Sequence, residues 1–203
     1  MRSFFIFIVS CLLISCDSNG KRTIIGDSPF QKKMNSDFKD ASKSPLTKTD
    51  LKKFKGLAFF PIDNKFKITA QLTKTPNSPV IPFQTTTERI VAYKKYGVVS
   101  FNIDGKNFSL NIYKDEAPEP IYKDYLFLPF LDKTNGRSTY KGGRYVEILT
   151  TDENKEGTQI TIDFNKAYNP YCAYNKEYSC PITPSENYLD IPIEAGVKAY
   201  EKP

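Results

Sequence analysis

The fold class of this 203-residue chain is decided by the stretch Val99-Ser100-Phe101-Asn102-Ile103-Asp104-Gly105-Lys106-Asn107-Phe108-Ser109-Leu110. At its centre, Asp104-Gly105 is the residue pair of a two-residue type I′ turn, in which both positions need positive φ angles. Folding about this pair sets Phe101 opposite Phe108 and gathers the apolar side chains of both arms on one face. The sequence therefore predicts an antiparallel hairpin with one buried face.

Segments with the same alternation lie on both sides of the hairpin. Further strands are expected over residues 66–73, from Ile90 onwards, and over residues 125–130, 145–150 and 158–164. The last two are expected to pair as an antiparallel hairpin, because the charged connection between them contains Gly157. No long helical pattern and no repeat is present. We expect a mainly β domain, either an antiparallel β sandwich or a partly open barrel.

Two other features flank the strands. Thr47 is a candidate N-cap with Asp50 at the third helical position, and Gly56 is a stop signal, so a short N-terminal helix is expected to run to about Lys55. Residues 165–192 are rich in proline, asparagine and tyrosine and contain two cysteines. Loops of this length inside a domain are usually functional or disordered, and here the composition predicts a long ordered C-terminal loop region.

The start of the chain has the order of a secretory signal. Arg2 is a short positive region, residues 4–14 are apolar, and Ser15 precedes Cys16. The last four of these residues, Leu13-Ile14-Ser15-Cys16, resemble the bacterial lipobox, in which the thiol receives a diacylglyceryl group and the peptide is cut just before it. An uncleaved membrane helix would need about 20 apolar residues, and plain secretion without lipid is the other alternative.

The chain is therefore expected to be a lipoprotein with three parts. Residues 1–15 form the signal peptide, residues 16–45 a lipidated flexible tether, and residues 46–203 a single β-rich domain. Palmitate-type acyl chains on Cys16 would anchor the protein, since each buried CH₂ contributes about 0.8 kcal/mol. The expected location is the cell envelope, on the inner or outer membrane, with the domain outside the cytoplasm, for example in the periplasm.

Charge follows the same division. Residues 16–55 hold ten Lys/Arg and five Asp/Glu, whereas residues 56–203 hold eighteen of each. The net charge of +6 therefore lies almost entirely before residue 56, in the tether and the short helix that follows it, where lysines near an anionic membrane gain about 1 kcal/mol each. Because the domain shows no basic stripe, nucleic acid is not expected as a partner.

Composition also limits the chemistry. The chain contains no histidine, which excludes Ser-His-Asp triads, Cys-His pairs and histidine-based zinc signatures. No cofactor and no metal are expected. After lipidation of Cys16, the cysteines that remain are Cys172 and Cys180. An oxidising compartment favours a disulfide between them, which would stabilise by roughly 2.5 kcal/mol, while free thiols and a metal or redox site stay open.

Two polar clusters are candidates for a site. Arg137 and Arg144 lie in a turn rich in hydrogen-bonding groups and can grip a carboxylate or phosphate bidentately; alternatively they pair with nearby acidic residues while Gly142 and Gly143 form a bulge. Asp163 sits at a strand end, and the alternative for it is an ordinary solvent-facing or turn-capping aspartate.

These residues also carry a resemblance to the bacterial family catalogued as domain of unknown function 1684. The matching stretches are residues 56–63, 130–134, Gly136, 139–145, 163–174, Cys180-Pro181, Pro184, Glu186-Asn187 and 193–196. The resemblance implies a β-rich domain and a shared polar site but no activity. Because similar domains without a secretion signal bear both cysteines, it also raises the weight of a thiol or metal role for them.

The leading hypothesis is a membrane-anchored domain that binds a small polar ligand. Its site would be lined by Arg137, Thr139, Tyr140, Arg144, Asp163, Asn165 and Asn169, beside the pair Cys172 and Cys180. The alternatives are a hydrolase-type enzyme, with Asp163 or Glu186 as acid–base and Arg144 as an electrostatic clamp, and a non-catalytic scaffolding lipoprotein. The two polar clusters can form one site only if Arg144, from the first, lies near Asp163, from the second.

Overall fold

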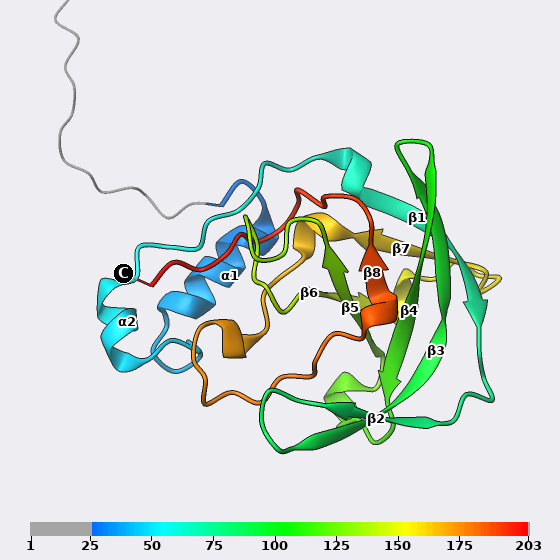
Figure 1. Cartoon of the computed structure of the whole chain (residues 1–203), viewed down its shortest axis with the longest axis horizontal. Helices are drawn as coiled ribbons and strands as arrows, with labels where there is room; N and C mark the ends of the chain where they lie inside the picture. The colour runs from blue at the N-terminus through cyan, green and yellow to red at the C-terminus, as the bar shows by residue number, and fades with distance from the viewer. Residues whose placement is uncertain (1–25, 203) are drawn as a thin grey trace, which may run out of the picture.

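The computed structural model describes residues 26–202, so the expected signal peptide and Cys16 lie outside the described range. One strongly curved sheet of eight strands dominates this part of the chain (Figure 1). Its strands are β1 (Lys67–Lys74), β2 (Val80–Gln84), β3 (Ile90–Ile103), β4 (Lys106–Asp115), β5 (Tyr125–Asp132), β6 (Arg144–Leu149), β7 (Gln159–Asp163) and β8 (Tyr188–Leu189). The order is β6-β5-β4-β3-β1-β7, with β2 on β3 and β8 parallel to β5. The expected mainly β fold, in its partly open barrel form, is confirmed.

The β3–β4 hairpin has the predicted turn and register. Asp104 and Gly105 have φ angles of +50° and +79°, and Phe101 pairs with Phe108. A bulge between Lys95 and Gly97 interrupts the β3–β4 ladder. The first half of β3 also pairs with β2, a strand that the sequence analysis did not identify.

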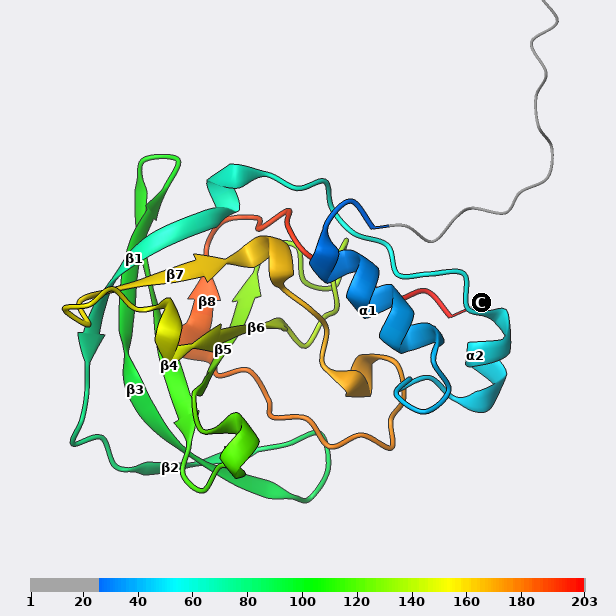
Figure 2. The same ribbon diagram turned by 180° about the vertical axis from the view of Figure 1, so that it is seen from behind.

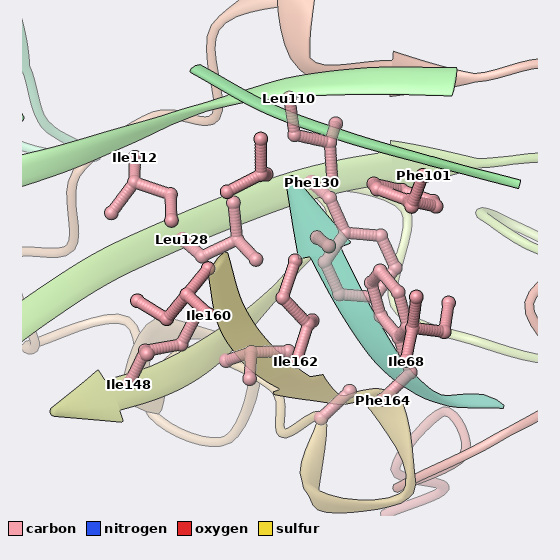
Figure 3. Packing of buried hydrophobic residues seen from close by; sticks show 14 of the residues in the cluster. Ile68, Phe101, Leu110, Ile112, Leu128, Phe130, Ile148, Ile160, Ile162 and Phe164 are labelled. Atoms are coloured by element: carbon pink, nitrogen blue, oxygen red, sulfur yellow. The ribbon is translucent and has the colours of Figure 1, made fainter. Parts of the chain in front are cut away.

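The hydrophobic core fills the concave side of the curved sheet. Its central side chains are Ile68, Phe101, Leu110, Ile112, Leu128, Phe130, Ile148, Ile160, Ile162 and Phe164 (Figure 3). Burying each such side chain stabilises the fold by about 1.5–3 kcal/mol. Since β6 and β7 are the two ends of the sheet order and both supply this core, the curvature brings the sheet ends toward one another.

The predicted hairpin between residues 145–150 and 158–164 is wrong. β7 pairs with β1, where Ile162 lies opposite Ile68, and β6 pairs with β5. The connection is not a tight turn: it begins with the 3-10 helix η3 (Thr150–Asp152), and Asn154 then accepts the backbone amides of Thr158 and Gln159. Both strands show the same apolar–polar alternation because both face one core. This alternation does not predict which strand each of them pairs with.

The short helix at residue 47 is confirmed. α2 (Lys48–Lys53) begins at Thr47, whose Oγ1 accepts the backbone amide of Asp50 at 3.1 Å. The expected flexible tether is wrong in its described part, residues 26–45, because α1 (Pro29–Lys39) packs on the domain (Figure 2). Phe38 is 3% exposed and meets Tyr174 with ring centroids 4.7 Å apart. This partner lies far away in the sequence, so local composition did not predict the contact.

The C-terminal loop region is ordered, as predicted. It contains the 3-10 helices η4 (Phe164–Lys166), η5 (Tyr171–Ala173) and η6 (Ser185–Asn187). Asn187 is fully buried between β4 and β5, where its Nδ2 donates to the carbonyls of Asn111 and Pro129 and its Oδ1 accepts the amide of Asn111. Because Pro129 has no backbone N–H with which to pair to β4, the Asn187 side chain links β4 and β5 at this position in place of a backbone hydrogen bond.

Candidate functional site

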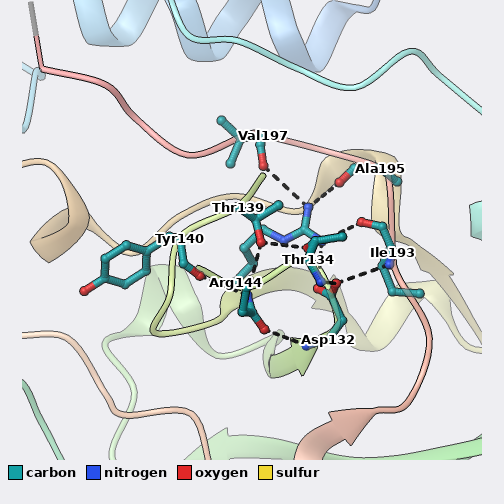
Figure 4. A network of polar contacts seen from close by, with 9 residues as sticks. Asp132, Thr134, Thr139, Tyr140, Arg144, Ile193, Ala195 and Val197 are labelled. Carbon is teal, nitrogen blue, oxygen red and sulfur yellow. Dashed lines mark hydrogen bonds and ion pairs between the residues drawn. The ribbon is translucent and has the colours of Figure 1, made fainter. Parts of the chain in front are cut away.

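Arg144 lies in the interior of the protein and not in an open site. Its side chain is 0% exposed, and its Nη2 contacts Asp132 Oδ2 at 2.9 Å and the carbonyl of Ile193 at 2.7 Å (Figure 4). Its Nη1 donates to the carbonyls of Ala195 and Val197. Burial lowers the pKa of the guanidinium, and Asp132 opposes this shift. The alternative that the arginine pairs with a nearby acidic residue is confirmed for Arg144.

The turn before Arg144 is held by its own polar groups. Thr139 is buried, and its Oγ1 shares a 2.7 Å hydrogen bond with Thr134 and accepts Asn135 Nδ2 at 3.1 Å. Gly143 has a φ angle of +89°, and a Cβ there would lie 2.7 Å from the carbonyl oxygen of Phe130, so glycine is required. Arg137 is exposed at the tip of this turn. The cluster therefore splits into a buried network and one surface arginine.

Asp163 and Asn165 fasten a corner at the end of β7. Asp163 Oδ1 accepts both the backbone amide and Nδ2 of Asn165. Asn165 in turn exchanges two hydrogen bonds with the backbone of Asp63, at 2.9 and 3.0 Å. The turn-capping alternative for Asp163 is thus confirmed. Asn169 is also fully buried and donates to the carbonyl of Lys198 at 3.0 Å.

The side chains of the two clusters have different hydrogen-bond partners. Each polar side chain is bound to its own part of the fold: Arg144 to Asp132, and Asp163 to Asn165. Because the β6–β7 hairpin is absent, the register that was expected to bring Arg144 to Asp163 is absent as well. Tyr140 is the predicted residue that lies beside the cysteine loop, where burial, and next the neighbouring Cys172, raise the pKa of its phenol to about 12.

A cavity of about 380 Å³ lies elsewhere, on the face of β5 and β6 that points away from the core. It is lined by Tyr93, Asp115, Ala117, Pro118, Glu119, Tyr122, Tyr125, Leu126, Phe127, Glu147 and Tyr168. The volume is within the usual range for small-molecule sites. Three carboxylates and five aromatic rings line it, and no lysine or arginine does.

Aromatic contacts and one hydrogen bond fix the cavity wall. Tyr93 stacks on Phe127 with ring centroids 5.2 Å apart, and Phe127 meets the edge of Tyr145 at 4.7 Å. The Tyr168 hydroxyl donates to Glu147 Oε1 at 3.1 Å and so orients that carboxylate. Burial, and next the charge of Asp115, raise the pKa of Tyr93 to about 12. The Tyr93 phenol therefore stays neutral at physiological pH, and the acidic side chains of the lining are Asp115, Glu119 and Glu147.

A second hollow of about 330 Å³ adjoins this one through Asp115 and Pro118. Its lining includes four lysines, in contrast to the acidic cavity. Two of them are paired, Lys74 with Glu153 at 2.6 Å and Lys94 with Glu116 at 2.9 Å.

Sequence reasoning missed the cavity residues. They come from β3, β4, β5, β6 and two loops, so no short motif joins them. The available signal was the acidic and aromatic stretch of residues 115–125, which holds Asp115, Glu119, Tyr122 and Tyr125. Glu147 carries a weaker signal, because it is the exposed charged position of an otherwise largely buried strand.

Comparisons with known proteins agree with the fold. Residues 52–198 match the family described as "Protein of unknown function (DUF1684)". Among solved structures, the chain is similar to the solution NMR structure of an uncharacterized protein from Haloarcula marismortui, with 33% sequence identity and a TM-score of 0.66, over 83% of this chain and 89% of that chain. No curated protein matches significantly.

Proposed function

Because the chain belongs to the DUF1684 family of proteins of unknown function, we propose a function from its own cavity: the β-rich domain binds a small organic cation. The observation that carries the proposal is the cavity lining, in which three carboxylates and five aromatic rings occur without a lysine or arginine. Carboxylates attract a positive charge, and aromatic faces accommodate its alkyl groups through cation–π contacts.

The wall residues suit this role energetically. A cation over a ring contributes about 0.5–1 kcal/mol at an exposed site and about 2 kcal/mol when desolvated. Glu147 is fixed by Tyr168, so binding costs little further ordering of that carboxylate. The exposed Tyr122 and Tyr125, with ring centroids 5.4 Å apart in an edge-to-face pair, border the mouth of the cavity.

The enzyme alternative is weaker, because Arg144 does not reach a substrate from its buried ion pair with Asp132. Asp163 likewise serves the backbone of its own turn. A binding domain requires neither residue in an open site.

We further propose that this domain is held in the cell envelope by lipid on Cys16. Support comes from the order of Arg2, the apolar residues 4–14, Ser15 and Cys16. In residues 26–202, no helix has the length and apolar character to cross a membrane.

Binding is tested by calorimetry and NMR with choline, ethanolamine and putrescine, each compared with a neutral isostere such as 3,3-dimethylbutan-1-ol for choline. At least one cation should bind more tightly than its neutral partner. Glu147→Gln should weaken that binding by about 1 kcal/mol, roughly fivefold. The control is Glu116→Gln, which removes a carboxylate that pairs with Lys94 and does not line the cavity. Equal binding of cations and neutral isosteres, or no binding of any probe, contradicts the proposal.

A further inference from the structure

The two cysteines meet where four segments of the chain converge. Cys172 lies in η5, Cys180 in the segment that follows, Thr86 in the connection from β2 to β3, and Tyr140 in the turn before β6. The backbone amide of Cys172 donates to Cys180 Sγ at 3.2 Å, so the Cys180 sulfur lies at the base of the Cys172 side chain. Both cysteines are thiols in this structure.

The two thiols differ in access. Cys172 is half-buried, whereas Cys180 is 7% exposed. The segment of Cys180 is fixed to the turn after β2, because Cys180 N donates to Thr86 Oγ1 at 3.1 Å and Thr86 N donates to the Cys180 carbonyl at 2.9 Å. A reactant from solution therefore reaches Cys172 first.

We infer that Cys172 and Cys180 form a dithiol–disulfide exchange centre, in which Cys172 attacks an exposed disulfide and Cys180 resolves the product. In the first step the Cys172 thiolate attacks one sulfur of the disulfide R–S–S–R′, a mixed disulfide forms, and R′–S⁻ leaves. In the second step Cys180, after losing its proton to solvent, attacks Cys172 Sγ, and R–S⁻ leaves. The disulfide in solution is reduced to two thiols, and the cysteine pair is oxidised.

Electrostatics support this order of attack. Interaction with Cys180, and after it with Thr86 and Tyr140, lowers the pKa of the Cys172 thiol, which favours the attacking thiolate. The same contact with Cys172, followed by burial, raises the pKa of Cys180. Once Cys172 is in a mixed disulfide its negative charge is gone, so Cys180 is freed to ionise. The titratable groups that face the pair are Tyr140 and Tyr145.

The surroundings favour exchange over a metal site. Within residues 26–202, no group of three or more His, Cys, Asp or Glu side chains is placed to hold a metal ion. The neighbours that act on the more accessible sulfur, besides Cys180, are Thr86 and Tyr140, and neither is a usual metal ligand. The centre is also independent of the acidic cavity, whose lining contains neither cysteine, so the two proposals fail separately.

The test uses the full-length protein extracted from membranes, reduced, freed of reductant and exposed to oxidised glutathione. In wild type, intact mass and peptide mapping should show a Cys172–Cys180 disulfide that dithiothreitol reduces again in the folded protein. Cys180→Ser should accumulate one glutathionyl group on Cys172. Cys172→Ser should react at least tenfold more slowly. Mapping separates these adducts from any thiol at Cys16.

Tyr140→Phe distinguishes an exchange centre from a structural pair. It removes one hydroxyl beside Cys172, so the first step should slow severalfold while the urea midpoint changes little. The inference is overturned by three results: equal adduct formation on Cys180 in Cys172→Ser, a disulfide that resists reduction in the folded protein, or stoichiometric zinc bound by both thiols in the purified protein.

Discussion

Replacing Arg144 by methionine tests whether this residue serves the fold. The guanidinium is the common donor to four acceptors: Asp132 Oδ2 and the carbonyls of Ile193, Ala195 and Val197. Methionine fills a similar volume but donates no hydrogen bond. The variant therefore leaves a buried carboxylate and three carbonyls without this partner.

The expected loss is large compared with the stability of a domain. Breaking a buried ion pair by removing one partner costs about 3–5 kcal/mol, because the remaining charge stays buried. Each orphaned carbonyl adds up to about 1 kcal/mol, and these losses do not add fully. We expect a total of about 4–6 kcal/mol, a large part of the roughly 5–15 kcal/mol of a typical domain. Part of the loss is offset because Asp132 keeps the backbone amides of Thr134 and Ile193.

Urea unfolding followed by circular dichroism measures this loss. Arg144→Lys provides a variant that keeps the charge but not the planar fork, and it should lose about 2–3 kcal/mol. Arg137→Met is the matched control at an exposed position of the same turn and should change stability by less than about 0.5 kcal/mol. A loss below about 1 kcal/mol for Arg144→Met, at unchanged m-value, would refute this structural role.

Three further predictions follow from other parts of the chain. Cys16→Ala should abolish labelling with radioactive palmitate, and equal labelling of both proteins contradicts lipid anchoring. Phe38→Ala should cost about 3–4 kcal/mol in urea unfolding, whereas Phe30→Ala, at a half-buried position of the same helix, should cost about 1 kcal/mol or less. Iodoacetamide should still alkylate Cys172 rapidly at pH values below the ordinary pKa of a cysteine thiol. The rate should fall only when the pH drops through the lowered pKa of Cys172, because protonation removes the thiolate. A pH–rate profile like that of a cysteine in an unstructured peptide contradicts this.

The sequence was sufficient to predict elements that are determined by residues close together in the chain. The Asp104-Gly105 turn fixes its own register, and Thr47 caps α2 through a residue three positions away. The neighbours of β7 were predicted wrongly, because β1 is separated from it by about 90 residues and both β1 and β6 offer a matching apolar face. The same reason explains α1, whose burial depends on Tyr174.

The candidate site shows a similar limit. The sequence made Arg144 a candidate for binding a ligand, with a nearby acidic residue as the alternative partner, and in the structure its partner is Asp132. The partner lies on β5, the strand beside β6. Asp115, Glu119 and Glu147 were not identified, since their shared cavity exists only after β5, β6 and the loop before β5 are brought together.

The residues that stabilise the fold and the residues that line the cavity come from different parts of the sequence. Several residues of the stretches that carry the family resemblance hold buried polar contacts: Asp132 and Arg144 pair in the core, Asn165 fastens Asp63, and Asn187 joins β4 to β5. Most of the acidic and aromatic side chains of the cavity come from outside those stretches, among them Tyr93, Asp115, Glu119, Tyr122, Tyr125 and Glu147. If the cavity is the binding site, relatives that keep the buried contacts but change the cavity lining should fold alike and bind ligands of different charge. Exchanging Glu147 for lysine is the direct test: it should reverse the preference for cations while leaving the urea midpoint nearly unchanged, because Glu147 is exposed.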